Sequence, residues 1–302
     1  MREEKRKTRY VEDKKEEVVI EETEEKDYSK LKKILLTCLI ILIIFFTYMK
    51  TIEPNIYIVK EYKVEDISLP DSFHGIKIVQ FSDIHYGTTI NKKELNKIVK
   101  KINKLKPDII VFTGDLIDNN ISINDNIKEE VITSLNNLDA SLYKYAIYGD
   151  EDDEKNYKEI MEKCDFKLLK NESTLLYYEE NIPIVIAGFD PIDSNPNYEI
   201  LSEQIEEKDI SNYYKIVLAH EPDTIDNIIS YNPNLVLTGS TLGGTIKIGK
   251  PLFTNHSKHY LDYERIENTD LYISNGLGTK GLNIRFNNYP SISLYRLYST
   301  NE

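Results

Sequence analysis

The sequence is poor in cysteine, glycine and proline, and it contains no tryptophan. Its 302 residues include 2 Cys, 12 Gly and 10 Pro. Two thiols exclude a disulfide scaffold and a zinc site built from cysteines. The low glycine and proline content excludes a collagenous or low-complexity chain. A hydrophobic fraction of 40%, with 22 tyrosines, also excludes a wholly disordered chain.

Positive side chains are outnumbered by negative ones. The chain carries 38 Lys and Arg against 51 Asp and Glu, a formal net charge of −13. Residues 1–33 contain 11 side chains of each sign, so the excess of acid lies in the remainder. Such a domain repels a phosphate backbone, and we therefore expect no nucleic acid partner. The acidic excess suits either a site that collects divalent cations or simply a solvated surface.

One long apolar run lies near the N-terminus. Residues 34–49 contain no charged side chain, and Thr51 and Ile52 extend the stretch past Lys50. This is slightly short of a full span, but lysines at both ends can extend to the membrane interfaces. A cleaved signal peptide would end in small residues, whereas this run ends in Phe-Phe-Thr-Tyr-Met. We therefore predict an uncleaved transmembrane signal anchor at 34–52, with the lipid bilayer as its partner.

The distribution of lysines predicts the orientation of this anchor. Four lysines precede the run closely, and only Lys50 follows it closely. The positive-inside rule then places the N-terminus in the cytoplasm and the C-terminal domain outside a cell membrane that is crossed once. The predicted organisation is a charged tail at 1–33, the anchor at 34–52, a linker with a first strand at 53–68 and a domain at 69–302.

Strand and helix patterns alternate beyond the anchor. Residues 76–82 and 109–113 predict short apolar strands, and 91–106 has the apolar spacing of a helix. Asn91 and Glu94 are placed for a capping box at the start of that helix. Further strands are predicted at 56–64, 143–148, 182–188, 215–219, 235–238 and, twice, within 271–298. This alternation predicts an α/β domain with one mixed sheet or two sheets.

Side chains that bind metals follow the ends of several predicted strands. Asp83 and His85 follow the first of them, and Asp115, Asp150 and His220 follow or end three others. In α/β sheets ligands bind beyond the carboxyl ends of strands, so these loops can converge on one site. We expect Asp83 and His85 to leave the same side of an extended segment and to reach one ion. Carboxylate and imidazole ligands suit manganese, iron or zinc, with one or two ions bound.

Four motifs carry a resemblance to a known family. They are S-D-I-H-Y-G at 82–87, G-D-L-I-D at 114–118, A-H-E-P-D at 219–223 and G-L-G-T-K-G-L-N-I-R-F at 276–286. In these motifs and their order, the chain resembles the calcineurin-like metallophosphoesterases, in particular their membrane-anchored bacterial branch. The resemblance covers about residues 57–298. It implies an αββα sandwich of two mixed β-sheets flanked by helices.

The resemblance also implies an activity and a set of ligands. The family hydrolyses phosphodiesters, phosphomonoesters or pyrophosphates with a metal-bound hydroxide at a two-ion centre. Asp83 and His85 would bind the first ion, Asp115 would bridge both ions, and Asp150 and His220 would bind the second. A phosphorylated lipid or cell-envelope headgroup would suit an enzyme anchored in this way.

The sequence departs from the family pattern at four positions of the site. Asp150 and Glu151 replace the Asn and His of G-N-H, and Ser240 and Leu242 replace both histidines of G-H-x-H. Glu151 would supply the family's acid only with a raised pKa, and when ionised it would repel a phosphate. Two hypotheses therefore stand. The chain is an active phosphoesterase, or it is a pseudoenzyme that acts as a membrane-tethered binding or regulatory module.

Other candidate side chains have simpler explanations. His256 and His259 could bind one ion if their segment were helical, but otherwise they are surface histidines. His74 is expected in an exposed turn, and Asp118 in a turn or a supporting role beside the ligands. For the acidic run 150–154, the alternatives are a bound cation such as calcium and a solvated helix start for its outer members.

Overall fold

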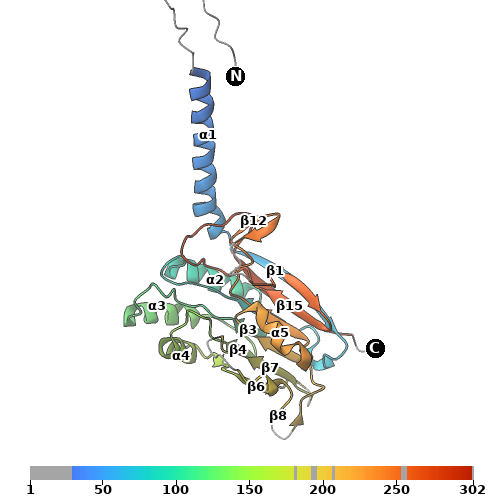
Figure 1. Cartoon of the computed structure of the whole chain (residues 1–302). Coiled ribbons are helices and arrows are strands. Elements are labelled where there is room, and N and C mark those ends of the chain that lie inside the picture. The colour runs from blue at the N-terminus through green and yellow to red at the C-terminus, as the bar shows by residue number, and fades with distance from the viewer. Residues whose placement is uncertain (1–28, 180–181, 192–195, 206–207, 253–256, 301–302) are drawn as a thin grey trace, which may run out of the picture. The chain divides into compact units, whose positions relative to one another are not determined.

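The chain forms two compact units, residues 1–46 and 47–302. The computed structural model describes residues 29–179, 182–191, 196–205, 208–252 and 257–300 (Figure 1). Most of the predicted tail at 1–33 therefore lies outside the described residues. The second unit begins inside the predicted anchor, and the other predicted domain boundaries stay predictions.

Helix α1 (Ser29–Thr47) accounts for the apolar run, and a short π-helical stretch (Tyr48–Ile52) continues it. The helical stretch Ser29–Asn55 is 27 residues long, and it alone in the described part of the chain is long and apolar enough to cross a membrane. The hydroxyl of Thr37 donates to Lys33 O at 3.0 Å, so its polar group is satisfied within the helix. The length and composition of α1 are compatible with the predicted anchor.

The second unit is built on two six-stranded mixed sheets. The first sheet contains, in spatial order, β1 (Ile58–Asp66), β16 (Ser291–Ser299), β2 (Lys77–Phe81), β3 (Ile109–Phe112), β4 (Tyr143–Ala146) and β5 (Lys167–Leu168). The second contains β14 (Tyr263–Ile266), β15 (Thr269–Ile273), β11 (Leu235–Thr238), β10 (Lys215–Leu218), β7 (Ile184–Gly188) and β6 (Glu172–Leu176). Two small hairpins complete the strands: β8 (Gln204–Ile205) with β9 (Lys208–Asp209), and β12 (Ile246–Ile248) with β13 (Lys250–Leu252).

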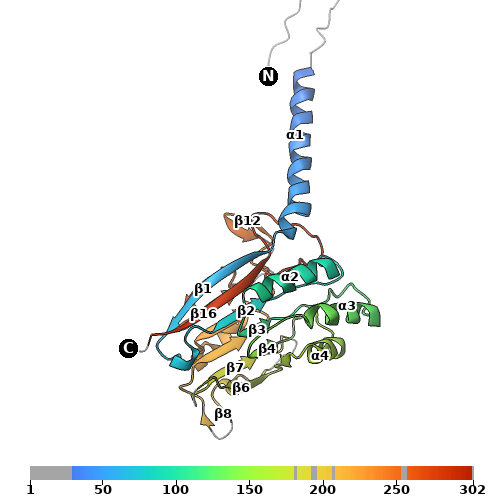
Figure 2. The ribbon, with the colours of Figure 1, turned by 180° about the vertical axis from the view of Figure 1, so that it is seen from behind.

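Helices cover the outer faces of the sheets. Figure 2 shows three of them, α2 (Lys92–Lys104), α3 (Asp125–Leu135) and α4 (Glu154–Lys163), on the first sheet. The short α5 (Ile225–Ile228) packs on the second sheet. Single 3-10 turns lie at Glu53–Asn55, Asp71–Phe73, Tyr198–Leu201, Pro222–Thr224 and Ile229–Tyr231.

Alternation of side chains along the strands separates the core into three layers. In β2, Val79 packs with the helices of the first sheet, whereas its neighbour Ile78 packs with residues of the second sheet. In β10, Ile216 belongs to the same middle layer, and Val217 packs with α5 on the far side. Because neighbouring residues of a strand point to opposite faces, each sheet is apolar on both faces. This arrangement confirms the αββα sandwich of two mixed sheets flanked by helices.

Helix α2 shows how local sequence starts and ends an element. The Asn91 side chain accepts from the backbone N–H groups of Lys93 (2.9 Å) and Glu94 (3.3 Å), which confirms it as the N-cap. The capping box is incomplete, because one Glu94 oxygen lies 3.9 Å from Lys97 Nζ and the other has no hydrogen-bond partner. The helix ends before Pro107, as the sequence predicts.

A buried polar bridge joins the two sheets where β2 and β11 end. Gln80 Nε2 donates to Thr113 Oγ1 at 3.0 Å and to Thr238 O at 2.9 Å. The Tyr295 hydroxyl donates to Gln80 Oε1 at 2.7 Å. The loops that follow β2, β3 and β11 are therefore held against one another, and the first two carry the predicted ligands Asp83, His85 and Asp115.

Candidate metal centre

The strand ends turn into the site through unusual backbone conformations. Asp83, His85 and Asp115 have φ values of +51°, +46° and +60°, in the left-handed region. The prediction that Asp83 and His85 leave one side of an extended segment is therefore wrong. Their backbone turns instead because the N–H groups of Asp83 and His85 donate to Gly114 O (2.9 Å) and Asp115 O (3.2 Å). Non-glycine residues persist in this region only where surrounding contacts hold them, and such residues cluster at functional sites.

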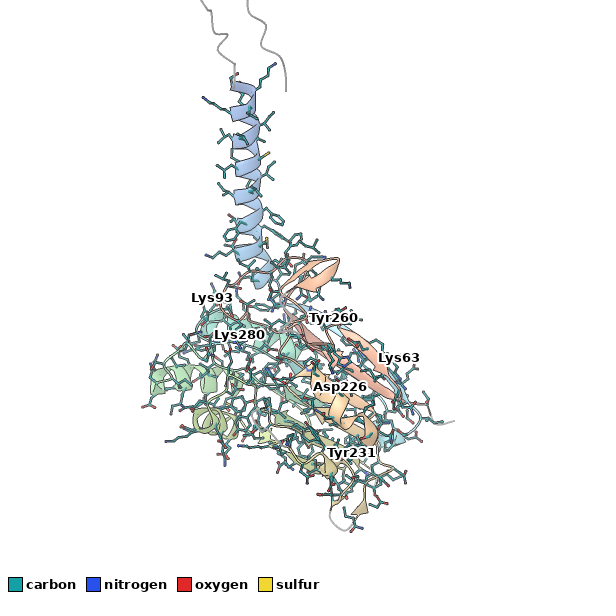
Figure 3. The ribbon with its side chains drawn as sticks, in the orientation of Figure 1. Lys63, Lys93, Asp226, Tyr231, Tyr260 and Lys280 are labelled. Atoms are coloured by element: carbon teal, nitrogen blue, oxygen red, sulfur yellow. The ribbon has the colours of Figure 1, made fainter. Side chains whose placement is uncertain are left out.

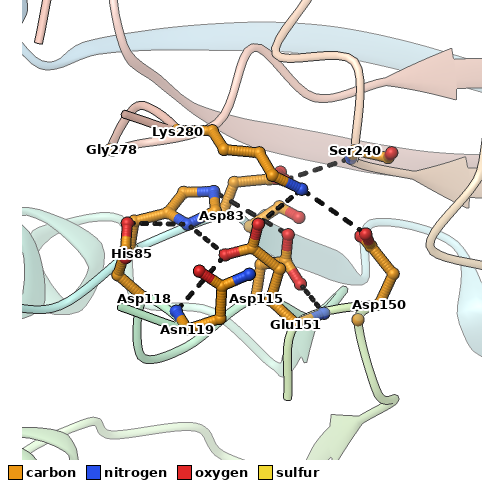
Figure 4. Close-up of polar contacts among 12 residues, drawn as sticks. Asp83, His85, Asp115, Asp118, Asn119, Asp150, Glu151, Ser240, Gly278 and Lys280 are labelled. Carbon is orange, nitrogen blue, oxygen red and sulfur yellow. Dashed lines mark hydrogen bonds and ion pairs between the residues drawn. The ribbon is translucent and has the colours of Figure 1, made fainter. Parts of the chain in front are cut away.

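Two groups of buried or half-buried ligand atoms share Asp115. The first group contains Asp83, Asp115 and His220, and the second contains His85, Asp115 and Glu151. Within each group the ligand atoms lie within 4.8 Å of one another. The fold thus brings together side chains from loops that are far apart in the sequence (Figure 4).

Two buried atoms in these groups lack hydrogen-bond partners, Asp83 Oδ2 and His85 Nδ1, and so does Asp118 Oδ2 beside His85. Burial of polar atoms without partners costs roughly 1–3 kcal/mol each. Burial raises the pKa of Asp83, and Asp115 adds to this effect. A divalent cation would satisfy such a buried carboxylate oxygen, so this donor set fits a metal ion.

The contacts of His220 show which of its ring nitrogens is directed at the candidate metal centre. Its Nδ1 lies 2.7 Å from Thr113 O, and because a carbonyl can only accept, Nδ1 carries a proton. Its Nε2 lies 3.1 Å from Asp150 Oδ1 and 3.4 Å from Asp115 Oδ2. Burial opposes protonation, but the two carboxylates raise the pKa of His220 well above its usual value. Nε2 therefore needs either a proton or a metal ion between itself and the carboxylates.

Asp150 and Glu151, the two substituted residues after β4, behave differently from one another. The Asp150 side chain is 43% exposed, and His220 and Lys280 lower its pKa. The Glu151 side chain is 2% exposed. Burial alone would raise the pKa of Glu151, but His85 and Lys280 bring it down to about 2. Glu151 therefore lacks the raised pKa that its predicted role as proton donor requires, and it lies instead within reach of His85.

The acidic run at 150–154 divides into buried and exposed parts. Asp153 caps α4 by accepting from Asn156 N at 2.8 Å, and Glu154 is exposed, as predicted for the outer members. Asp152 is buried and accepts three backbone N–H groups, from Gly149 (2.8 Å), Asp115 (2.9 Å) and Leu116 (2.9 Å). Burial and the charge of Asp115 nevertheless raise the pKa of Asp152 to about 7. Asp152 positions the Asp115 loop, a role that the sequence alone did not show.

Ser240 and Leu242, at the positions where the family has histidines, make contacts of other kinds. Ser240 N donates to Asp83 Oδ1 at 3.1 Å, so the backbone at this position still contacts the centre. Leu242 is buried and packs closely against Gly276. A Cβ added to this glycine would lie only 2.4 Å from Leu242 Cδ2. A pocket of about 240 Å³ opens beside Ser240. Its lining consists of Asp150, Glu221, Pro222, Asp223, Ser240, Thr241, Ser257 and Lys280.

The remaining histidines do not join the centre. His256 lies outside the described residues. His259 Nδ1 lies 2.9 Å from Glu264 Oε2, and its Nε2 lies 3.3 Å from Asp226 Oδ1, so it forms ion pairs elsewhere. His74 is exposed in a turn and packs edge-on against Tyr298, which confirms its prediction. Asp118 lies 3.9 Å from His85 Nδ1 and also accepts from Asn120 N at 3.0 Å, a supporting position.

Comparisons with known proteins agree with this geometry. The sequence model described as "Calcineurin-like phosphoesterase" matches residues 76–274. This chain belongs to the calcineurin-like phosphoesterase family. The matched region contains Asp83, Asp115, Asp150 and His220, which the structure brings together.

Among relatives of this calcineurin-like phosphoesterase, the uncharacterized metallophosphoesterase YkuE of Bacillus subtilis is 33% identical, with 84% of this chain and 90% of that protein covered. The UDP-2,3-diacylglucosamine pyrophosphatase LpxG of Chlamydia muridarum is 27% identical, covering 81% and 90%. A Bos taurus transmembrane protein with a metallophosphoesterase domain is 28% identical, covering 74% of this chain and 53% of that one. The structure of Haemophilus influenzae NAD nucleotidase is similar with a TM-score of 0.43 and 13% identity, covering 67% and 50%.

Proposed function

We propose that this chain is a membrane-anchored, divalent-metal-dependent phosphoesterase that hydrolyses a phosphodiester, a phosphomonoester or a pyrophosphate. The observation that carries the proposal is the buried group of Asp83, Asp115 and His220, with an unpartnered Asp83 oxygen and a His220 nitrogen facing carboxylates. Manganese, iron or zinc would fit these atoms.

The residues have separate roles in this proposal. Asp83, His85, Asp115, Asp150 and His220 would hold the metal, with Asp115 shared between both ligand groups. When bound, the metal would activate water and polarise the phosphoryl group. Thr113 O keeps the proton of His220 on Nδ1 and so leaves Nε2 directed at the centre. Ser240 N holds the Asp83 carboxylate in place, and Asp152 holds the backbone of Asp115.

The anchor and a second surface support a substrate at the membrane. We place the chain in the cell membrane, with the tail in the cytoplasm and the domain outside. A cavity of about 900 Å³ lies between α2 and α3, with Ile121 and Ile127 on its walls. Four lysines of α2 also line it: Lys92, Lys93, Lys97 and Lys100. In a chain of net charge −13, this basic surface favours an anionic lipid headgroup or cell-envelope phosphate as substrate.

One observation favours the alternative of a pseudoenzyme that serves as a membrane-tethered binding or regulatory module. Leu242 fills the space against Gly276 with apolar atoms, where the family has a histidine ligand. The loss of this ligand and of the one at Ser240 weakens any centre that needs two tightly held ions.

The first prediction separates these two functions. Full-length protein in detergent micelles is stripped of metal, reloaded with manganese and assayed on bis-p-nitrophenyl phosphate, p-nitrophenyl phosphate and a nucleoside-diphosphate sugar. Loss of a residue that only hydrogen-bonds a metal ligand typically lowers metal affinity or activity about 10–100-fold. Asp115 would be a ligand itself, so we expect Asp115→Ala to lower the rate of hydrolysis about 100-fold or more. The matched control is Asp125→Ala, at a fully exposed carboxylate of α3, which leaves the rate unchanged. Equal rates for the parent chain and Asp115→Ala would leave the pseudoenzyme as the function.

A further inference from the structure

Lys280 places a positive charge beside the ligand groups. It lies in the loop that follows β15, within the motif at 276–286. Its ammonium forms a close ion pair with Glu151 Oε1 and lies 3.5 Å from Asp150 Oδ2 (Figure 4). Both of its partners are residues at which this chain departs from the family pattern.

The loop that carries Lys280 is held firmly from both sides. The fully buried Arg285 guanidinium donates to Asn275 O at 2.9 Å and to Gly278 O at 2.6 Å. Gly278 N donates to Asp83 O at 2.7 Å, and Thr279 N donates to Thr89 Oγ1 at 3.1 Å. The backbone on which Lys280 stands is therefore fixed relative to the centre, unlike that of an ordinary surface lysine.

The charge balance of the centre depends on this ammonium. Six carboxylates belong to the ligand groups or lie beside them: Asp83, Asp115, Asp118, Asp150, Glu151 and Asp152. Within the described part of the chain, Lys280 is the only lysine or arginine that forms an ion pair with any of them. Because Glu151 is 2% exposed, its ion pair with Lys280 is screened less than a surface pair.

Lys280 affects the two ligand groups unequally. It forms its close ion pair with Glu151, a member of the His85–Asp115–Glu151 group. It forms no ion pair with the described residues of the Asp83–Asp115–His220 group, and its contact with Asp150, which lies beside His220, is longer at 3.5 Å. A divalent ion in the His85–Asp115–Glu151 group would share the Glu151 carboxylate with the ammonium of Lys280, which is also positively charged. The two cations repel each other and compete for the same oxygens, so the ammonium weakens metal binding there.

We propose that Lys280 is a tethered cation that stands in for the second metal ion. The chain then holds one ion tightly, at Asp83, Asp115 and His220 with Asp150 beside them, and the ammonium weakens the binding of a second ion at the His85–Asp115–Glu151 group. This inference rests on the proposed function, because it requires that the centre binds metal. It also explains why Glu151 and Lys280 occur together, since each charge neutralises the other at a site where the family uses a histidine.

The test is a metal titration of the full-length protein in detergent micelles. Ions per chain are counted by mass spectrometry after loading with manganese, and stepwise affinities are measured by calorimetry. We expect one tight ion in the parent chain. In Lys280→Met, which keeps side-chain length but removes the charge, we expect a second ion to bind at least about 10-fold more tightly than in the parent. Lys280→Arg keeps the charge and should behave like the parent.

The matched control is Lys63→Met, at an exposed lysine of β1 that is labelled in Figure 3 and should leave the titration unchanged. Lys280→Gln repeats the test if circular dichroism shows that the methionine variant does not fold. A second-ion affinity that changes less than about 10-fold, or no second ion in either protein, overturns the role of Lys280 but leaves a metal-dependent phosphoesterase. Absence of any bound ion in both proteins overturns the proposed function as well.

Discussion

At the scale of single residues, His259 shows how a histidine outside the centre is used. Its ring lies between Glu264 (2.9 Å) and Asp226 (3.3 Å), with Lys258 also paired to Asp226. Burial would lower the pKa of His259, but the hydrogen bonds with Glu264 and Asp226 raise it above its usual value. The residue therefore joins β14 to α5 through a charge that depends on pH.

The sign of this pH dependence follows from linkage. A folded-state pKa above the unfolded value of about 6.5 gives stability that is complete below pH 6.5. That stability disappears as the pH rises through the folded pKa. We expect His259→Gln to lower the free energy of unfolding by about 0.5 kcal/mol at pH 6 and to have no electrostatic effect at pH 9, since the pair is partly exposed.

The measurement is urea unfolding of the full-length protein in micelles, followed by circular dichroism at both pH values. Leu261→Ala is the control, because this exposed side chain carries no titratable group and should give the same difference at pH 6 and pH 9. An effect of His259→Gln that is equal at both pH values would contradict the role of its charge.

At the scale of elements, the loop between β15 and β16 is organised by one buried cation. Arg285 donates to the carbonyl groups of Asn275, Gly276, Gly278 and Asn288. Burial lowers its pKa to about 10, so it remains charged at neutral pH. A planar guanidinium can satisfy several carbonyls at once, whereas the compact ammonium of lysine cannot match this geometry.

We therefore expect Arg285→Lys to lower the free energy of unfolding by about 3 kcal/mol, because buried carbonyls lose their donors and a charge loses its partners. The control is Arg296→Lys on β16, a partly exposed side chain that pairs with Glu61 and should cost less than about 1 kcal/mol. Urea unfolding of both variants measures the difference. Equal costs would show that the buried hydrogen bonds of Arg285 do not stabilise the loop.

At the scale of the whole molecule, the predicted orientation across the membrane rests on charge. Lys26, Lys30, Lys32 and Lys33 precede the apolar run, and Lys50 follows it. We expect protease added to intact bacterial cells to digest the domain at 53–302, while an epitope tag at the N-terminus stays protected. The tag should become sensitive once the cells are permeabilised. A domain that resists protease until permeabilisation would place it in the cytoplasm instead.

The order of elements and much of the centre could be predicted from the sequence. The strands at 76–82, 109–113 and 235–238 and the Asn91 cap depend on neighbours within a few residues, so local patterns reveal them. Asp83, His85, Asp115, Asp150 and His220 follow strand ends, and parallel strands bring such ends to one edge. The general position of the centre was therefore predictable.

Other features required the folded chain. Asp83 and His85 do not extend from a strand, because hydrogen bonds to the loop at 114–115 turn their backbone. The sequence did not reveal the buried role of Asp152, because this residue lies in an acidic run that resembles a helix start. Lys280 lies within the motif at 276–286, but no spacing rule connects it with Glu151.

The sequence by itself determined the apolar helix, the alternation of strands and helices, the family and which side chains of that family are missing. These depend on composition, short-range periodicity and motifs, all of which lie along the chain. Only the tertiary structure decided which carboxylates lie close enough to share an ion, which nitrogen of His220 carries a proton and where the ammonium of Lys280 lies. Such properties depend on distance and burial between residues far apart in sequence, because electrostatic energy in a protein is set by separation and solvent exposure.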